Sequence, residues 1–145
     1  MSLRIAIACD HGGFELKDHL FQVLVKDGFE VTNLGVDSTD SVDYPEKAHA
    51  LANAILTGAA DRGVLVCGTG IGVSIAANRH AGIRAALCTD PVCAQLSREH
   101  NDANVLCLGG RIIGPVLAEA ILKSFLDTSF EGGRHERRIE KIETL

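Results

Sequence analysis

Short apolar runs alternate with polar stretches along this chain of 145 residues. The runs are rich in Val, Ile, Leu and Ala and end at glycines or polar turns. Such runs are typical of strands that are buried on both faces of a parallel sheet. The expected strands cover residues 4–9, 29–34, 63–67, 82–88 and 104–108.

The segments between these strands carry apolar residues at helical spacing. Asp90 before Pro91 is a good helix start, with an N-cap followed by proline at the first helical position. The expected helices cover residues 14–26, 44–56, 72–79, 91–101 and 114–126. Strand and helix alternate five times, which predicts one α/β domain over residues 1–145. We expect a doubly wound, Rossmann-like, five-stranded parallel sheet with helices on both faces.

A further charged segment, residues 135–142, is also predicted to be helical. Its apolar residues are Ile139 and Ile142. A helix with so little apolar surface is poorly buried on its own fold. We therefore expect it to pack against a partner subunit.

Candidate chemistry centres on the turn after the central strand. Cys67 ends that strand, and Gly68, Gly70 and Gly72 follow at alternate positions. Glycines let the backbone approach a ligand, and a helix start beyond them presents free N–H groups. This field stabilises a thiolate, so Cys67 is a candidate base or nucleophile beside an oxyanion site. The alternative is a buried core cysteine followed by a tight turn.

Further polar residues follow other strands, and ligands of doubly wound sheets bind at the carboxyl ends of strands. Thr69 can reinforce the oxyanion donors or make hydrogen bonds within its turn. Asp10 is a candidate site residue or an N-cap, and His11 is a candidate anion contact. Arg111 follows the fifth strand, where it contacts a ligand or makes a loop salt bridge.

Three further basic residues are also candidates. Arg134 and Arg138 lie four residues apart on one helical face, which suits a phosphate or carboxylate clamp. The alternative is a solvated helix in which Glu136 and Glu140 are their partners. His100 is either a catalyst or a cation at a helix C-terminus.

Composition narrows the function classes. The net charge is −5 and aromatic residues make up 4%, which argues against nucleic acid as a partner. No apolar stretch is long enough to cross a membrane, and we expect no signal peptide. Five cysteines without ligand spacing favour a reduced cytoplasmic protein with neither zinc nor another metal.

Signatures of several common enzyme classes are absent. The glycine pattern lacks the spacing of a dinucleotide site, no nucleotide P-loop is present, and Val73 stands where a cysteine phosphatase has arginine. What remains is a thiol, hydroxyls, imidazoles and arginines. Together these groups can bind a small phosphorylated substrate and move a proton beside a carbonyl without a cofactor.

Five motifs resemble the ribose-5-phosphate isomerase B family, which is related to the galactose-6-phosphate isomerase subunits. They occur in the family's order across essentially the whole chain. The motifs are Cys9–Phe14, Asp43-Tyr44-Pro45, Cys67–Asn78, His100–Asn104 and Gly132–His135.

The resemblance implies interconversion of ribose 5-phosphate and ribulose 5-phosphate, a step of the pentose phosphate pathway, through an enediolate. Cys67 would be the base, while Thr69 and the N–H groups of Gly68, Gly70, Ile71 and Gly72 would hold the oxyanion. His100 would open the sugar ring with help from Asp10. The phosphate would bind to His11, Arg134 and Arg138, and the pocket would be completed by Asn101, Arg111 and Tyr44.

The family also implies a homodimer or homotetramer whose sites are shared between subunits. Some relatives use a glutamate near the position of Val73, so this chain resembles the branch with a cysteine base. Three alternatives stay open. They are an isomerase of six-carbon sugar phosphates such as allose or galactose 6-phosphate, a hydrolase with a Cys67–His100 pair, and a sugar-phosphate sensor without catalysis.

Overall fold

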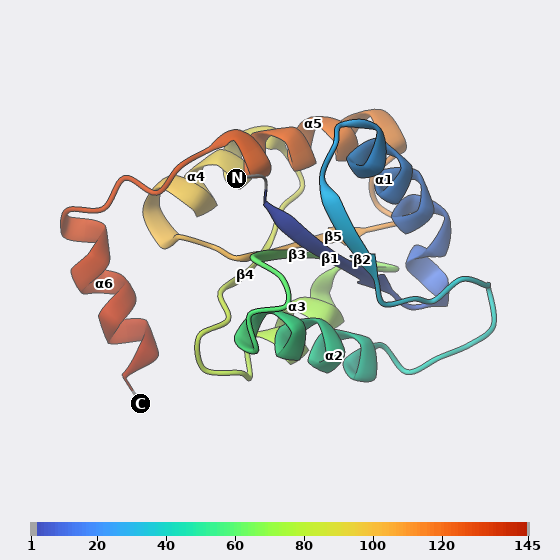
Figure 1. Cartoon of the computed structure of the whole chain (residues 1–145), viewed down its shortest axis with the longest axis horizontal. Helices are drawn as coiled ribbons and strands as arrows, with labels where there is room; N and C mark the ends of the chain where they lie inside the picture. Colours follow the sequence, from blue (N-terminus) through green and yellow to red (C-terminus); the bar gives the residue numbers. More distant parts are fainter. Residues whose placement is uncertain (1–2, 145) are drawn as a thin grey trace.

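The computed structural model describes residues 3–144, which form one parallel sheet between two layers of helices (Figure 1). The strand order is β2-β1-β3-β5-β4. In chain order the elements are β1 (Arg4–Cys9), the 3-10 turn η1 (His11–Gly13), α1 (Phe14–Lys26), β2 (Glu30–Asn33), α2 (Tyr44–Leu56), β3 (Arg62–Cys67), α3 (Ile71–Ala77), β4 (Ala85–Leu87), α4 (Pro91–Asn101), β5 (Val105–Gly109), α5 (Pro115–Asp127) and α6 (Arg134–Glu143). The predicted fold class is confirmed.

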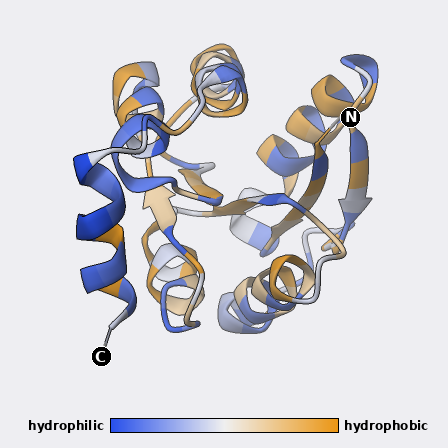
Figure 2. Ribbon diagram, turned by 60° about the vertical axis from the view of Figure 1, so that its left-hand side comes forward, coloured by the Kyte–Doolittle hydropathy of each residue, from blue (hydrophilic) through white to orange (hydrophobic). Residues whose placement is uncertain are grey.

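The three central strands are buried on both faces, as their apolar runs predict. Successive side chains of β1 alternate between the two cores: Ile5 and Ile7 face one, and Ala6 and Ala8 face the other. The first core lies under α1, α4 and α5, and the second under α2 and α3 (Figure 1). Figure 2 shows the hydrophobic strands at the centre, between helices whose outer faces are polar.

Both edge strands are shorter than predicted. β2 covers Glu30–Asn33 rather than residues 29–34, and β4 covers Ala85–Leu87 rather than residues 82–88. Gly82 has a φ of +88°, and the Ile83 N–H donates to the His80 carbonyl, so a turn occupies the start of the apolar run. The apolar run therefore predicted the strand but not the residue at which it begins.

The helix starts follow their sequence signals. The Asp90 side chain accepts a hydrogen bond from the Cys93 N–H at 2.8 Å, and Pro91 is the first residue of α4. α3 ends at Ala77 rather than at residue 79. Asn78 ends it because its side chain accepts from the Ala85 N–H and donates to the Ala85 carbonyl, at 2.8 and 3.0 Å.

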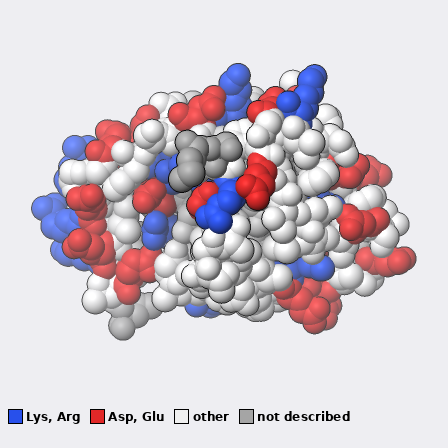
Figure 3. Space-filling view, in the orientation of Figure 1, with Lys and Arg blue, Asp and Glu red and all other residues white. Residues whose placement is uncertain are grey.

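α6 lies at one end of the molecule, apart from both helix layers (Figure 1). His135 is its buried residue, whereas Ile142 is 54% exposed. Basic and acidic side chains alternate along it, and charged groups of both signs crowd this end of the molecule in Figure 3. The low burial expected for this helix is confirmed. No helix among residues 3–144 has the length and apolarity needed to cross a membrane.

Gly13 sits where η1 passes directly over β3, so we predict that the substitution Gly13→Ala destabilises the fold. A Cβ atom there would lie 2.5 Å from the Val66 carbonyl oxygen. Backbone must move to make room, and such overpacking costs about 1–3 kcal/mol. The control is Gly114→Ala, where a Cβ meets no atom within 4 Å, and the expected loss is below about 1 kcal/mol. Urea unfolding measures both, and equal losses would contradict this packing.

Candidate active site

Three loops meet at the carboxyl ends of β1, β3 and β5. The Asp10 N–H donates to the Val66 carbonyl at 3.2 Å, the Gly110 N–H to the Cys67 carbonyl at 2.8 Å, and the Arg111 N–H to the Gly68 carbonyl at 2.9 Å. α1 leaves β1 toward one face of the sheet, and α3 leaves β3 toward the other. This switch point is the usual ligand crevice of a doubly wound sheet.

The Cys67 sulfur lies inside the glycine-rich turn. Cys67 is 5% exposed, and its sulfur accepts a hydrogen bond from the Gly70 N–H at 3.1 Å. Gly70 has a φ of +80°, a conformation that other residues rarely adopt, and this turn aims its amide at the sulfur. The sulfur and a backbone donor therefore share one short turn.

Other amides of the turn have no protein acceptor. Within residues 3–144, the N–H groups of Gly68, Thr69 and Gly72 make no hydrogen bond to the protein. The Ile71 N–H donates to the Thr69 hydroxyl oxygen at 3.2 Å. The turn-bonding role of Thr69 is therefore confirmed, and its hydroxyl proton remains able to donate to a ligand.

Tyr44 and Arg111 flank the turn. A Cβ on Gly72 would lie 2.5 Å from Tyr44 Cε1, and a Cβ on Gly68 would lie 3.2 Å from Arg111 Nη1. The phenol ring and the guanidinium therefore rest directly against the glycine backbone. The start of α2 and the loop after β5 thus each place a side chain against the glycine turn.

Asp10 and His11 complete this group. Asp10 is 8% exposed, and its Oδ1 accepts from the N–H groups of Gly12 and Gly13 at 2.9 and 3.2 Å. The N-cap alternative for Asp10 is therefore confirmed. His11 Nδ1 accepts from the Val42 N–H at 3.2 Å. That contact assigns the proton of the neutral ring to Nε2, which makes Nε2 a hydrogen-bond donor.

The loop that holds Val42 against His11 is tied down by a buried lysine. Lys17 is fully buried, and its Nζ donates to Asn33 and Asp37 at 3.3 and 3.1 Å. The Lys17 ammonium holds the pKa of the Asp37 carboxyl below its usual value. Lys17 carries no signal in the sequence, because its spacing is that of an ordinary helix residue.

The other four candidate residues lie at the opposite edge of the sheet. Arg84, which precedes β4, donates through Nε to the Asn101 carbonyl at 3.0 Å. The Asn104 carbonyl accepts from the N–H of Gly63, at the start of β3. The carboxyl end of α4 is therefore beside the amino ends of the strands, and α6 lies on the same side (Figure 1). Candidates placed there are His100, Asn101, Arg134 and Arg138.

His100 stacks on a second histidine that the sequence analysis left without a role. The ring centroids of His100 and His135 are 4.5 Å apart, and Glu131 Oε1 is 3.7 Å from His100 Nε2. His135 is 5% exposed, and its Nε2 has no hydrogen-bond partner among residues 3–144. Burial lowers the pKa of His135, and His100 and Arg134 lower it further, so its ring is neutral at neutral pH. The one sign of His135 in the sequence is that it directly follows the turn Gly132-Gly133-Arg134.

His100, Glu131 and His135 are also the group with the geometry closest to a metal site. Their donor atoms lie within 4.8 Å of one another. Arg134 and Arg138 add positive charge beside His135, which opposes the binding of a cation. Both arginines are exposed and form no ion pair with Glu136 or Glu140 in the described chain, so their guanidinium groups are open to an anion.

The other four cysteines have raised pKa values. Burial raises the pKa of Cys9 and of Cys88 to about 11, and it raises the pKa of Cys107 well above its usual value. Cys93 is exposed, and the Asp90 carboxylate raises the pKa of its thiol. These four thiols are therefore protonated at neutral pH.

Comparison with known proteins shows the family of this chain. The family model described as ribose/galactose isomerase matches residues 5–142. The chain belongs to this family. A crystal structure of a ribose 5-phosphate isomerase from Thermotoga maritima is 53% identical, with a TM-score of 0.98 and full coverage of both chains.

Relatives within the ribose/galactose isomerase family carry more than one substrate name. Ribose-5-phosphate isomerase B of Escherichia coli is 49% identical over 142 residues, which cover 98% of this chain and 95% of the relative. D-erythrulose-4-phosphate isomerase of Pectobacterium atrosepticum is 45% identical over 141 residues, or 97% and 93% of the two chains. Family membership therefore fixes the type of reaction more firmly than the length of the sugar.

Asp10 caps η1, so we predict that Asp10→Ala lowers the free energy of unfolding by about 1 kcal/mol. Asp10→Asn should lose much less, because asparagine is an equally good N-cap. Thermal and urea unfolding of both variants measure the difference. Equal stability of the wild type and Asp10→Ala would show that the cap contributes nothing to the fold. Any loss of activity in Asp10→Asn then reports on the carboxylate itself.

Proposed function

We propose that this protein interconverts ribose 5-phosphate and ribulose 5-phosphate, with Cys67 as the base. The supporting observation is one short turn that holds both parts of the chemistry. The Gly70 amide donates to the Cys67 sulfur, and the amides of Gly68, Thr69 and Gly72 are free to donate to a developing oxyanion. The identities to isomerases of this name support the same substrate.

The reaction is a proton transfer within the sugar. The Cys67 thiolate removes the C2 proton of the open-chain aldose, and the electron pair forms the enediolate while charge gathers on the carbonyl oxygen. The same thiol returns its proton to C1 while the proton of the O2 hydroxyl passes to O1, which gives the ketose. Each donor aimed at such an oxyanion is worth roughly 3–4 kcal/mol by analogy with acyl transfer, and a placed base adds about 10²–10⁴-fold.

The remaining candidate residues open the sugar ring and bind the phosphate. His100 protonates the ring oxygen to open the furanose, and Asp10 assists. His11 Nε2, Arg134 and Arg138 bind the phosphate, supported by the open guanidinium groups and by the tautomer that Val42 assigns to His11. Asn101 completes the group of residues at the edge with His100. Arg111 and Tyr44 complete the group at the edge with Cys67.

This reaction needs residues from two chains. Cys67 ends β3, and the segment after His100 lies at its start. β3 has six residues, and a strand rises about 3.3 Å per residue, so the two edges are roughly 17 Å apart. A ribose phosphate is shorter than this. Each site is therefore completed by His100, Asn101, Arg134 and Arg138 of a second copy in a homodimer, or in a tetramer of two such dimers.

Exposed apolar side chains support an assembly. They gather on α3, β4, α4 and the start of α5, around the edge of the sheet that β4 forms. The exposed residues there are Ile71, Ile75, Leu87, Val92, Leu96, Ile112, Val116 and Leu117. Large apolar surfaces of this kind are typical of protein interfaces.

The alternatives are weaker for specific reasons. A Cys–His hydrolase within one chain needs a hydrogen bond between Cys67 and His100, and these residues lie at opposite edges. Substrate length is more open, because a relative is named as an isomerase of a four-carbon phosphate. Five-carbon turnover should nevertheless exceed that of four- and six-carbon phosphates. A sensor would bind ribose 5-phosphate without turnover.

The proposed reaction belongs to the pentose phosphate pathway, in the cytoplasm. All five cysteines are free, and Cys67 must stay reduced to act as a base. A reducing compartment supplies both conditions.

We predict that Cys67→Ala abolishes both turnover and hydrogen exchange. In deuterated water the wild type should place solvent deuterium on the exchanging carbon of the product. Without the thiolate, the rate should fall by at least about 10²–10⁴-fold. Mass spectrometry and NMR of the product measure exchange and turnover in one reaction.

Cys93→Ser is the matched control, because Cys93 is exposed and lies on α4, outside the glycine turn. It should retain wild-type exchange. Retained turnover in Cys67→Ala would show that another group is the base. Turnover without deuterium uptake would point instead to hydride transfer.

Shared sites predict rescue between two inactive variants. Cys67→Ala and His100→Asn should each be inactive as pure proteins. After unfolding and refolding together in equal amounts, half of the dimers are mixed, and each mixed dimer has one intact site. The mixture should regain about a quarter of wild-type activity, the result expected for a two-fold dimer. A mixture that stays inactive would contradict a site built from two chains.

A further inference from the structure

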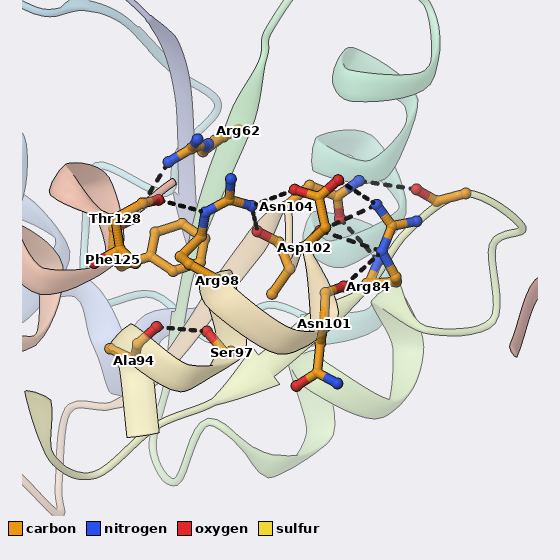
Figure 4. Close-up of polar contacts among 12 residues, drawn as sticks. Arg62, Arg84, Ala94, Ser97, Arg98, Asn101, Asp102, Asn104, Phe125 and Thr128 are labelled. Carbon is orange, nitrogen blue, oxygen red and sulfur yellow. Dashed lines mark hydrogen bonds and ion pairs between the residues drawn. The ribbon is translucent and has the colours of Figure 1, made fainter. Parts of the chain in front are cut away.

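The Arg84 guanidinium donates hydrogen bonds to the carboxyl end of α4. Its Nε donates to the Asn101 and Asp102 carbonyls at 3.0 and 3.2 Å, and its Nη2 donates to the Asp102 carbonyl at 3.0 Å (Figure 4). The last carbonyls of a helix have no partner within the helix, so the guanidinium satisfies groups that would otherwise need water. His100 and Asn101 are the last two residues of this helix.

The same guanidinium also holds the end of α6. Arg84 Nη1 donates to Glu143 Oε1 at 2.8 Å, and Glu143 Oε2 accepts from the Gly82 N–H at 3.0 Å. The Gly82 amide and then Arg84 hold the pKa of the Glu143 carboxyl below its usual value. The carboxylate is therefore charged at any pH at which the enzyme would work.

α6 has few other anchors. Its first turn is held by the His135–His100 stack, and its entry by the Glu131 N–H, which donates to the Glu99 carbonyl at 3.2 Å. The far end has an exposed Ile142 and a hollow of about 660 Å³ between it and β4. The Glu143–Arg84 contact therefore fixes the direction in which α6 presents Arg134 and Arg138.

The neighbouring Arg98 connects a different pair of helices. Its Nε donates to the Thr128 carbonyl at 3.1 Å, and its Nη1 donates to the Asp102 carboxylate at 2.8 Å and to the Ala103 carbonyl at 2.6 Å (Figure 4). Arg98 is 4% exposed and ties α4 to the end of α5 without reaching α6. Of these two arginines, Arg84 is the one that bonds to both α4 and α6.

We infer that Arg84 is a positioning residue, which holds His100 and Asn101 on α4 in a fixed arrangement with Arg134 and Arg138 on α6. This inference rests on the proposed function, in which those four residues receive the ring and the phosphate of one substrate. A single guanidinium sets the distance between the ring-opening group and the phosphate clamp. Placement errors of about 1 Å in such groups cost large factors in rate.

The experiment measures kcat and KM for ribose 5-phosphate in variants of the full chain. Glu143→Ala frees only α6, so KM should rise about tenfold with kcat nearly unchanged, the loss expected for a charged hydrogen bond. Arg84→Met frees both helices, so KM should rise and kcat should fall as well. In the double variant the KM effects should not multiply, because both substitutions remove the same contact.

Arg4→Met is the matched control. It breaks the Arg4–Asp61 ion pair, whose shortest contact is 3.0 Å, at the start of β1 and away from α4 and α6. Its kinetic constants should equal those of the wild type. An active wild type with the same constants in Arg84→Met and Arg4→Met would overturn the role of Arg84 and leave the proposed function intact. A folded wild type without isomerase activity would overturn the proposed function itself.

Glu143→Ala decides the question if Arg84→Met does not fold. Glu143 lies in the last turn of an outlying helix, so its removal leaves both cores untouched. A normal KM in this variant would show that α6 needs no link to Arg84. Hydrogen exchange along α6 adds a readout independent of substrate, and it should quicken in both variants and stay unchanged in Arg4→Met.

Discussion

All five strands run in one direction, and this constraint organises the chemistry of the protein. Every strand ends at the same edge of the sheet, so the loops after β1, β3 and β5 meet and bring Asp10, Cys67 and Arg111 together. A helix that follows a strand must return to the other edge before the next parallel strand begins. His100 lies at the end of such a return. The sheet therefore separates Cys67 from His100 within one chain, and the proposed site combines them from two copies.

Within the first half of the site, the backbone provides most of the electrostatics. The glycine turn aims one amide at the Cys67 sulfur and leaves others free, so one segment supplies the donors for both parts of the proposed chemistry. Burial raises the pKa values of Cys9 and Cys88 to about 11. The same residue type thus serves as packing in one position and as a candidate base in another.

Local signals predicted local features well. Asp90 before Pro91 fixed a helix start, and alternate glycines after Cys67 marked the turn. Relations between distant segments were not readable, because they depend on packing. Nothing in the sequence near Arg84 indicates that its guanidinium joins α4 to α6, and the burial of His135 follows from its stack on His100. The apolar run at residues 82–88 also overstated β4, since Gly82 forms a turn.

A crystal structure of the assembled protein with a ribose 5-phosphate analogue bound tests the central claim most directly. If the site is shared, one ligand should contact Cys67 of one chain and His100 of the partner subunit. Its phosphate should lie between His11 and the partner subunit's Arg134 and Arg138. A ligand enclosed by residues of a single chain would contradict it.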